Sequence, residues 1–295
     1  MYKGQVIMVW GMSLMLLNCI KLSRPHQWLK NLMLFFPPFL GGALLVPGVW
    51  VRGLIPFAAF CCASSSVYIV NDIMDIHLDR AHPVKRFRPL PAGAIATPVA
   101  GGVACLLLIV ATYLGSLVST TFLLLLLAYL AVSWSYSLWF KHLPLFDIFC
   151  IASGFLFRLL AGGVAFGIEV SEWLFLTVFL LAIFLGTGKR LGEKGFLGSH
   201  AGAHRKALDT YPDGFLDGTM YMTGGAVLVT YTLYVIAHHR LIFTVPLCCF
   251  GLLRYILRIK SGRAGDPTES LLKDPILFLV GMVWVAATAW GVYAG

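Results

Sequence analysis

The chain has 295 residues, of which 59% are hydrophobic and only 12% are charged, and its formal net charge is +9. A soluble domain carries roughly 25% charged residues, so this composition, with a mean hydropathy of +0.85, excludes a water-soluble protein and indicates an integral membrane protein. The positive charge does not indicate a nucleic-acid partner, because no long basic run or aromatic-basic motif is present. An unequal distribution of charge across a membrane explains it better.

Residues 1–20 form an apolar N-terminal extension with a single charge, Lys3. Such a segment is typical of a signal-peptide core, of a helix lying on the membrane, of one extra span or of a start-site artefact. The sequence leaves these alternatives open. We expect residues 21–295 to form one domain.

Uncharged apolar runs predict the membrane spans, because crossing the hydrocarbon core takes about 20 residues of helix. Long runs cover 31–51, 53–71, 89–140, 218–239 and 275–295, and shorter or interrupted ones cover 143–168, 173–188 and 241–259. The run at 89–140 must fold back on itself, and the polar stretch 116–121 is the expected turn. The predicted fold is therefore an all-α integral membrane bundle of about nine transmembrane helices.

The stretch 71–93, NDIMDIHLDRAHPVKRFRPLPAG, is densely charged although apolar runs flank it. Asp72, Asp75 and Asp79 stand three and four residues apart, which places them along one face of a helix. Three stacked carboxylates repel one another, and a divalent metal would neutralise them. Mg²⁺ takes oxygen ligands and is usually held by one or two carboxylates together with substrate phosphates. Asn71 would add an amide oxygen or orient a ligating carboxylate.

Bases follow these acids directly. Lys85, Arg86 and Arg88 are suited to phosphate oxygens, since arginine can make two parallel contacts to them. The loop therefore predicts a magnesium diphosphate site, in preference to a solvated, salt-bridged turn at the membrane surface.

Lysine and arginine also predict the orientation of the chain. If 71–93 is cytoplasmic, alternation of the spans puts 18 of the 22 Lys and Arg residues on the same side, as the positive-inside rule requires. We expect a multi-pass protein of the bacterial inner membrane whose active site faces the cytoplasm.

The pattern N-D-x-x-D-x-x-x-D at 71–79 resembles the first aspartate-rich motif of the UbiA superfamily of intramembrane prenyltransferases. Five further stretches are similar to its decaprenyl-phosphate phosphoribosyltransferase branch: RPHQWLKN at 24–31, DRAHPVKRFRPLPAG at 79–93, YSLWFKH at 136–142, RLLAGG at 158–163 and GKRLGEK at 188–194. The resemblance covers residues 22–295 nearly throughout.

This resemblance implies a bundle around a central cavity with cytoplasmic cap loops, and dependence on Mg²⁺. It implies transfer of 5-phosphoribose from phosphoribosyl diphosphate to a polyprenyl phosphate, decaprenyl or undecaprenyl, for the arabinose precursor of cell-envelope arabinan. The implied metal ligands are Asn71, Asp72, Asp75 and Asp79, and the three aspartates with Arg86 are the implied catalytic residues. The implied substrate-binding residues are Lys30, Lys85, Arg86, Arg88, Tyr136, Lys141, Arg158, Lys189, Arg190 and Glu193.

Several of these residues also have plain structural explanations. Lys189 and Glu193 stand one turn apart at a helix end, where local charge matching is common, although their cytoplasmic side favours a substrate contact. Lys30 is equally explained as an interfacial anchor. Arg158 lies about 16 Å deeper along its helix than Asp147; an arginine at such depth is a functional candidate, and a buried structural ion contact is the alternative.

A second set of acids, Asp209, Asp213 and Asp217, imitates the second aspartate-rich motif of aromatic prenyltransferases in the superfamily. Pro212 interrupts the helix that would align them, so we interpret the set as a mimic. An aromatic prenyltransferase with an isoprenyl diphosphate donor stays as the nearest alternative. A transporter is a weaker one, because most ionisable groups crowd one membrane surface instead of the bilayer midplane. A homo-oligomer is compatible with the sequence.

Overall fold

The computed structural model describes residues 15, 17–81, 83–197, 210–237, 241–263 and 265–294. The N-terminal extension up to residue 14 and Asp209 therefore lie outside the described residues. All regular secondary structure in the described part is helical, which confirms the all-α fold.

Eight helices in this part of the chain are long and apolar enough to cross a membrane. They are α3 (Val49–Met74), α5 (Thr97–Val118), α6 (Thr120–Leu138), α7 (Phe146–Phe166), α8 (Glu172–Leu197), α11 (Phe215–Ala237), α12 (Val245–Lys260, which follows the 3₁₀ turn η5, Ile242–Thr244) and α14 (Pro275–Tyr293). They coincide with the apolar runs that the sequence predicts from residue 53 onward. The long run divides at Ser119, whose hydroxyl caps α6 by accepting the N–H of Phe122 at 3.1 Å, so the predicted turn is confirmed.

The prediction of one continuous helix at 31–51 is wrong. The chain instead forms the 3₁₀ helix η1 (Pro25–Phe35) and the short helix α2 (Phe36–Leu40). Pro37 and Pro38 cannot donate backbone hydrogen bonds, and a Gly-rich loop follows. With a rise of about 2.0 Å per 3₁₀ residue and about 1.5 Å per α residue, the two segments together measure about 30 Å, close to the thickness of the hydrocarbon core.

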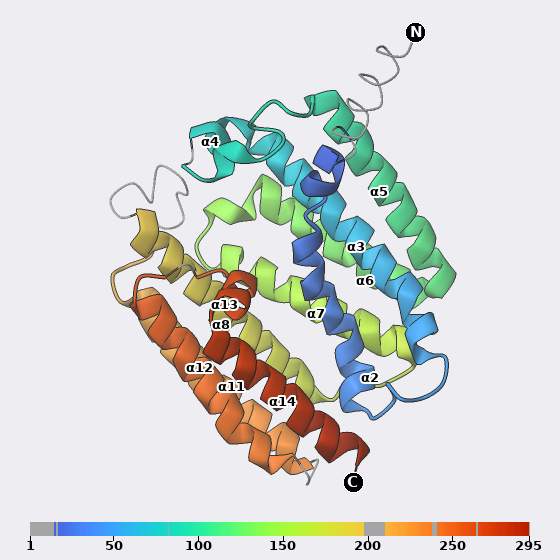
Figure 1. Cartoon of the computed structure of the whole chain (residues 1–295), viewed down its shortest axis with the longest axis vertical. Helices are drawn as coiled ribbons and strands as arrows, with labels where there is room; N and C mark the ends of the chain where they lie inside the picture. Colours follow the sequence, from blue (N-terminus) through green and yellow to red (C-terminus); the bar gives the residue numbers. More distant parts are fainter. Residues whose placement is uncertain are drawn as a thin grey trace, which may run out of the picture.

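Helix α7 connects the two halves of the bundle. It packs against α3, α6 and η1 on one side and against α8 on the other. Figure 1 shows η1 and α2, in dark blue, running through the molecule between the α3–α5 pair and the group of α8, α11, α12 and α14. An irregular backbone is tolerated at this depth where neighbouring helices bury it, as they do at Asn31 and Leu34.

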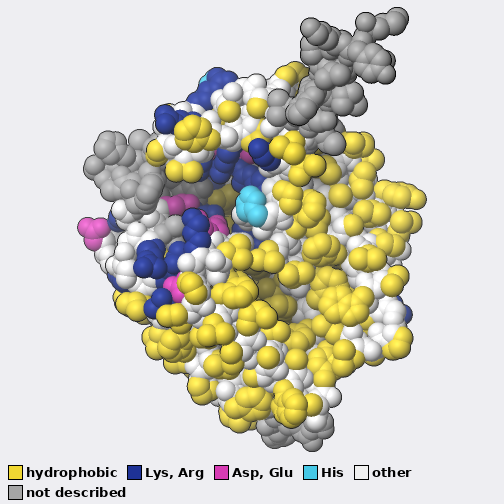
Figure 2. Space-filling model, viewed as in Figure 1, with side chains coloured by type: hydrophobic (Ala, Val, Ile, Leu, Met, Phe, Trp, Pro, Cys, Tyr) yellow, Lys and Arg dark blue, Asp and Glu magenta, His cyan; other side chains and the backbone are white. Residues whose placement is uncertain are grey.

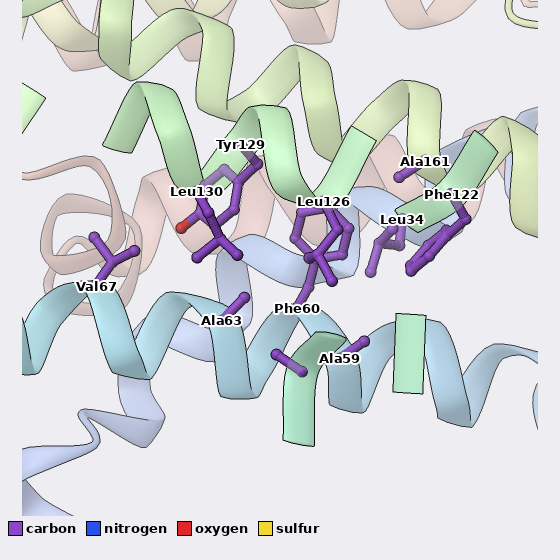
Figure 3. Close-up of a cluster of buried hydrophobic side chains, with 11 residues drawn as sticks. Leu34, Ala59, Phe60, Ala63, Val67, Phe122, Leu126, Tyr129, Leu130 and Ala161 are labelled. Carbon is purple, nitrogen blue, oxygen red and sulfur yellow. The ribbon is translucent and has the colours of Figure 1, made fainter. Parts of the chain in front are cut away.

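A buried apolar cluster holds η1 in this position. Side chains of α3, α6 and α7 meet there around Leu34, including Phe60 and Leu126 (Figure 3). Gly162 lets the backbones approach, since a Cβ atom at this position would lie 2.2 Å from the carbonyl oxygen of Leu34. The glycine of RLLAGG therefore determines how closely η1 packs on α7.

Among the described residues, four short helices occupy loops at one end of the bundle: α4 (Ile76–Ala81), η2 (Lys85–Phe87), η3 (Phe140–His142) and α13 (Pro267–Lys273). Alternation of the long helices puts the C-terminal end of α3, both ends of the α6–α7 connection and the C-terminal end of α8 at this same end. The charged motifs of distant sequence segments are thereby brought together.

Candidate active site

The three aspartates of the first motif lie where α3 ends. The prediction that they share one face of a single helix is only partly met, because α3 ends at Met74 and α4 begins at Ile76. Asp75 terminates α3, although its N–H still bonds to the carbonyl oxygen of Asn71 at 2.9 Å. Since the N–H of Asp79 bonds in turn to the carbonyl of Asp75 at 2.8 Å, the chain keeps a nearly helical course and the acids stay close.

Arg88 connects two of these acids. Its Nη1 atom lies 3.1 Å from Asp72 Oδ1 and 2.6 Å from Asp79 Oδ2, and Lys85 Nζ lies 3.8 Å from Asp79 Oδ1. Asp72 also accepts a hydrogen bond from Arg24, which precedes η1. The carboxylates are nearly inaccessible, at 1% exposure for Asp72 and 3% for Asp79, so the bases neutralise charges that burial would otherwise make costly.

Asp75 belongs to a neighbouring cluster. Its Oδ1 atom accepts a hydrogen bond from Lys141 Nζ at 2.6 Å, and Asn71 Nδ2 donates to its Oδ2 atom at 3.2 Å. Lys141 lies on η3, where its side chain is buried. The predicted residues Asn71, Asp75 and Lys141 thus contact one another beside the Arg88 cluster.

A cavity of about 280 Å³ opens next to the Asp72–Arg88 pair. Segments far apart in the sequence line it: Lys21, Arg24, His26, Gln27, Lys30, Tyr68, Asp72, Arg88, Pro89, Lys189 and Asp266. Figure 2 shows this side of the molecule hollowed, with lysine, arginine and acidic side chains gathered around the hollow. Five Lys or Arg residues face only two Asp residues in the lining, which makes the cavity suited to a ligand with several negative charges.

Lys189 and Asp266 form another part of the cavity lining. Lys189 Nζ lies 3.3 Å from Asp266 Oδ2. Burial opposes ionisation of Asp266, but the ammonium groups of Lys189 and Lys30 outweigh it and lower the pKa of this carboxyl below its ordinary value. Asp266 is therefore an ionised carboxylate within a largely cationic cavity.

Arg190, Tyr136 and Glu193 form a separate network. Arg190 is fully buried and donates from Nε to Asp147 Oδ2 at 2.6 Å, from Nη1 to Glu193 Oε2 at 2.6 Å and from Nη2 to the Tyr136 hydroxyl at 3.2 Å. Tyr211 also donates to Asp147, at 2.7 Å. The network fixes the C-terminal part of α8 against the start of α7, and Arg190 has no exposed surface with which to meet a ligand.

Arg158 lies in the core of the bundle. Its guanidinium donates to Asn31 Oδ1 at 2.7 Å, to the Gly154 carbonyl at 2.7 Å and to the Tyr129 hydroxyl at 3.1 Å. It also stacks over the Tyr129 ring, with Cζ 4.6 Å from the ring centroid. These partners are neutral, so they hold the charge by hydrogen bonds and ring contacts.

Of the substrate-binding residues expected from the sequence, the structure brings Lys30, Arg88 and Lys189 into the cavity lining. Arg86 is exposed and stacks on the Phe87 ring, with Cζ 4.8 Å from its centroid. The lining residues that sequence reasoning did not assign to the site are Lys21, Arg24, His26, Gln27, Tyr68, Pro89 and Asp266. Arg24 and Gln27 belong to the RPHQWLKN stretch, so the resemblance of that stretch could have identified them as site residues. The Asp-Pro-Thr-Glu sequence at Asp266 indicates only the start of a helix.

The two described carboxylates of the second acid set, Asp213 and Asp217, pair with different lysines. Asp213 is exposed and pairs with Lys194 at 3.1 Å, whereas Asp217 pairs with Lys260. Among the described residues no group of three or more His, Cys, Asp or Glu side chains is arranged around a common metal position.

An apolar groove of about 360 Å³ lies beside residues 20–28, which include the start of η1. Its lining consists of Ile20, Ser23, Pro25, Trp28, Phe57, Ala58, Cys61, Cys62, Ser65 and Leu107. Residues 20–28 therefore separate two sites. Lys21, Arg24 and Gln27 face the charged cavity, whereas Ile20, Pro25 and Trp28 face the groove.

Comparisons with known proteins agree with this arrangement. The sequence profile of the UbiA prenyltransferase family matches residues 35–281. A decaprenyl-phosphate phosphoribosyltransferase of Mycolicibacterium smegmatis is 32% identical, over 93% of this chain and 92% of its own length. Another from Corynebacterium glutamicum is 34% identical, over 93% of this chain and 86% of its own.

Solved structures share the fold. A UbiA homologue from Archaeoglobus fulgidus bound to GPP and Mg²⁺ gives a TM-score of 0.74 at 20% identity, over 94% of this chain and all of that one. The homologue bound to Cd²⁺ gives a TM-score of 0.70 at 19% identity, over 93% and 98% of the two chains.

Proposed function

The chain belongs to the UbiA prenyltransferase family, and we propose that it is a membrane phosphoribosyltransferase. It transfers 5-phosphoribose from phosphoribosyl diphosphate to a polyprenyl phosphate and releases diphosphate. Two relatives that are 32% and 34% identical over 93% of the chain carry the name of this activity. The observation that carries the proposal within the structure is the cationic cavity beside the first aspartate motif.

The charge of the cavity favours this donor. Phosphoribosyl diphosphate is anionic at both ends, with a diphosphate on C1 and a phosphate on C5, and the five lysines and arginines of the lining can serve both ends. An isoprenyl diphosphate has an apolar tail in place of the second anion. It would leave some of these cations desolvated and unpaired, which costs several kcal/mol.

The acid cluster fits a magnesium ion by its chemistry. Asp72, Asp75 and Asp79 offer carboxylate oxygens, the ligands that Mg²⁺ takes in proteins, and such sites are usually completed by substrate phosphates. All three carboxylates are now paired with bases. Binding of a magnesium diphosphate would let the carboxylates turn to the metal and let Arg24 and Arg88 turn to phosphate oxygens, so charge stays balanced throughout.

The reaction then needs no strong general base. The phosphate monoester of the lipid is already ionised, and one of its oxygens forms a bond to C1 of the ribose while the bond from C1 to the diphosphate oxygen breaks. Negative charge accumulates on the leaving diphosphate, where Arg88 and Lys189 stabilise it electrostatically. Asp72, Asp75 and Asp79 would hold magnesium, which would supply the remaining charge neutralisation. The proposed role of the exposed Arg86 is to receive the donor at the cavity entrance.

The apolar groove suits the acceptor. A polyprenyl phosphate has an apolar chain and an anionic head, and residues 20–28 present an apolar side to the groove and a cationic side to the cavity. In our proposal the isoprenoid chain lies along Ala58 and Cys62 on α3, and its phosphate reaches Lys21 and Arg24.

In the proposal, charged residues deeper in the bundle act by holding other side chains in place. Arg190 holds Asp147 and Glu193 in place, and the proposed role of Glu193 is to orient a ribose hydroxyl. Arg158 holds Asn31, and therefore the course of η1 beneath Lys30. In this assignment Arg158 and Arg190 shape the cavity instead of touching the donor.

The same proposal places the protein in the bacterial inner membrane with the cavity on the cytoplasmic side, where the alternation of spans expected from the sequence would put 18 of the 22 Lys and Arg residues. The product would serve as an arabinose precursor for the cell envelope. Self-association stays a prediction, which light scattering of the purified protein would check.

Turnover by the purified protein tests the function directly. Labelled phosphoribosyl diphosphate, a polyprenyl phosphate and Mg²⁺ should give a labelled lipid, and chelation of the metal should stop its formation. Transfer from an isoprenyl diphosphate to an aromatic acceptor, without reaction of phosphoribosyl diphosphate, would establish the aromatic prenyltransferase alternative.

A further inference from the structure

Asp266 occupies a rigid position at the start of α13. Its Oδ1 atom accepts the backbone N–H groups of Thr268 at 3.1 Å and Glu269 at 3.2 Å, which caps the helix. Pro267 occupies the first turn, where its fixed φ suits the helix start. One carboxylate oxygen is therefore committed to the backbone.

The segment that carries Asp266 is also packed tightly on α8. A Cβ atom on Gly265 would lie 2.4 Å from the carbonyl oxygen of Gly188, and one on Gly188 would lie 2.5 Å from the ring of Tyr255. The Tyr255 hydroxyl donates to the Gly265 carbonyl at 2.7 Å. These contacts leave no room for side chains, so they fix the distance between Asp266 and Lys189.

The second oxygen, Oδ2, lies 3.3 Å from Lys189 Nζ, and both residues line the cavity. A carboxylate is unfavourable in a site that binds only phosphates, because it repels them. It is favourable if the ligand presents hydrogen-bond donors, since bonds to an ionised acceptor are about twice as strong as neutral ones. Ribose hydroxyls are such donors, and an isoprenyl chain has none.

We propose that Asp266 Oδ2 accepts a hydrogen bond from a ribose hydroxyl of the donor and so selects a phosphoribosyl over an isoprenyl diphosphate. Lys189 orients the carboxylate, and Asp72 with Arg88 binds the diphosphate in the same cavity. This inference rests on the proposed function and adds a specificity-determining residue to it. The alternative is that Asp266 only caps α13 and pairs with Lys189.

The Asp266→Asn variant distinguishes the proposed contact with a ribose hydroxyl from a purely structural role of Asp266. Asparagine caps helices as well as aspartate does, so α13 should persist, but an amide NH₂ replaces or competes with the Oδ2 acceptor. Affinity for phosphoribosyl diphosphate should fall roughly ten- to hundredfold, the range for a lost hydrogen bond to a charged group. Affinity for inorganic diphosphate with Mg²⁺ should stay the same or rise, because a negative charge has been removed.

Asp274→Asn is the matched control. Asp274 caps α14 through the N–H groups of Ile276 and Leu277, both at 3.1 Å, and pairs with Arg254 at 3.1 Å, but it does not line the cavity. Loss of a charged cap alone should therefore leave the ratio of the two affinities unchanged. If Asp266→Asn does not fold, Asp266→Ser also retains a capping oxygen and removes the carboxylate.

Donor analogues that lack the 2- or the 3-hydroxyl complete the test without depending on a variant. The wild-type protein should bind one of them roughly tenfold or more weakly than the full donor, and Asp266→Asn should lose this discrimination. Equal binding of both analogues and the donor by the wild-type protein would overturn the inference, as would equal losses for donor and diphosphate in the variant. Failure of the wild-type protein to bind phosphoribosyl diphosphate at all would instead overturn the proposed function.

Discussion

Asp72→Asn should change two properties of the site in opposite directions. Affinity for diphosphate in the absence of metal should rise, while turnover with Mg²⁺ should fall steeply. Asp72 is 1% exposed and accepts hydrogen bonds from Arg24 and Arg88. The amide keeps the size of the side chain and one acceptor oxygen but removes the charge, so both guanidinium groups lose a counter-charge.

The structure indicates how large these effects should be. Arg88 keeps Asp79 at 2.6 Å, so about one positive charge, that of Arg24, becomes available to a ligand. Unit charges about 5 Å apart interact with about 3 kcal/mol at an effective dielectric constant near 20, and screening reduces this to roughly a tenfold gain in affinity. A lost metal ligand removes several kcal/mol of transition-state stabilisation, so kcat should fall by roughly 10²- to 10³-fold.

Calorimetric titration with diphosphate, in EDTA and in Mg²⁺, measures the first effect, and transfer of labelled phosphoribose measures the second. Asp213→Asn is the control, because Asp213 is an exposed carboxylate that pairs with Lys194 at the same end of the bundle. It should change neither property. Thermal unfolding confirms that both variants are folded.

Two results would refute the reasoning. Near-normal turnover by folded Asp72→Asn would exclude this carboxylate as a metal ligand. Unchanged affinity for metal-free diphosphate would show that Arg24 and Arg88 do not turn to phosphate when the carboxylate charge is removed.

Three other predictions concern packing, the acceptor and orientation. Gly162→Ala should lower the free energy of unfolding by about 1–3 kcal/mol, since its Cβ would overlap the backbone of η1. Gly225→Ala, with open space around it, should not destabilise the protein. Thermal unfolding in detergent compares the two variants, and equal melting temperatures would contradict the packing argument. Ala58→Trp should fill the apolar groove and raise KM for a polyprenyl phosphate without changing the Kd of phosphoribosyl diphosphate. A normal KM for the lipid would show that the groove does not bind the acceptor. In a cysteine-free background, Arg86→Cys should react with an impermeant thiol reagent only from the cytoplasmic side. Arg52→Cys, near the N-terminal end of α3, should react only from the outside. The reverse pattern would show that the chain has the opposite orientation in the membrane.

Local sequence was enough to predict most of the helices. A helical span requires only length and continuous apolarity, because the bilayer imposes internal hydrogen bonding on any segment that crosses it. The apolar runs therefore predicted α3 and the spans that follow it, and the serine at 119 marked the reversal between α5 and α6. The run at 31–51 satisfied the same rule and failed, because Pro37 and Pro38 interrupt the helical hydrogen bonds within it and the surrounding helices allow a 3₁₀ backbone instead.

The candidate site was predictable only as far as its residues are close in sequence. The spacing of Asp72, Asp75 and Asp79 and the bases that follow them are local features, so the sequence alone placed an acid and base cluster at the end of one helix. Their partners come from elsewhere: Arg24 is 48 residues from Asp72, and Lys141 is 66 residues from Asp75.

Helix packing alone decided which distant charges meet. Lys189 and Asp266 are 77 residues apart, and they come together because Gly188 and Gly265 allow two backbones to touch. Arg190, the next residue after Lys189, is rotated by about 100° on α8 and lies fully buried on Asp147 instead of in the cavity. Sequence determines which side chains are charged and at which end of the bundle they lie; which of them share a cavity depends on helix rotation and close approach, which are properties of the packed bundle.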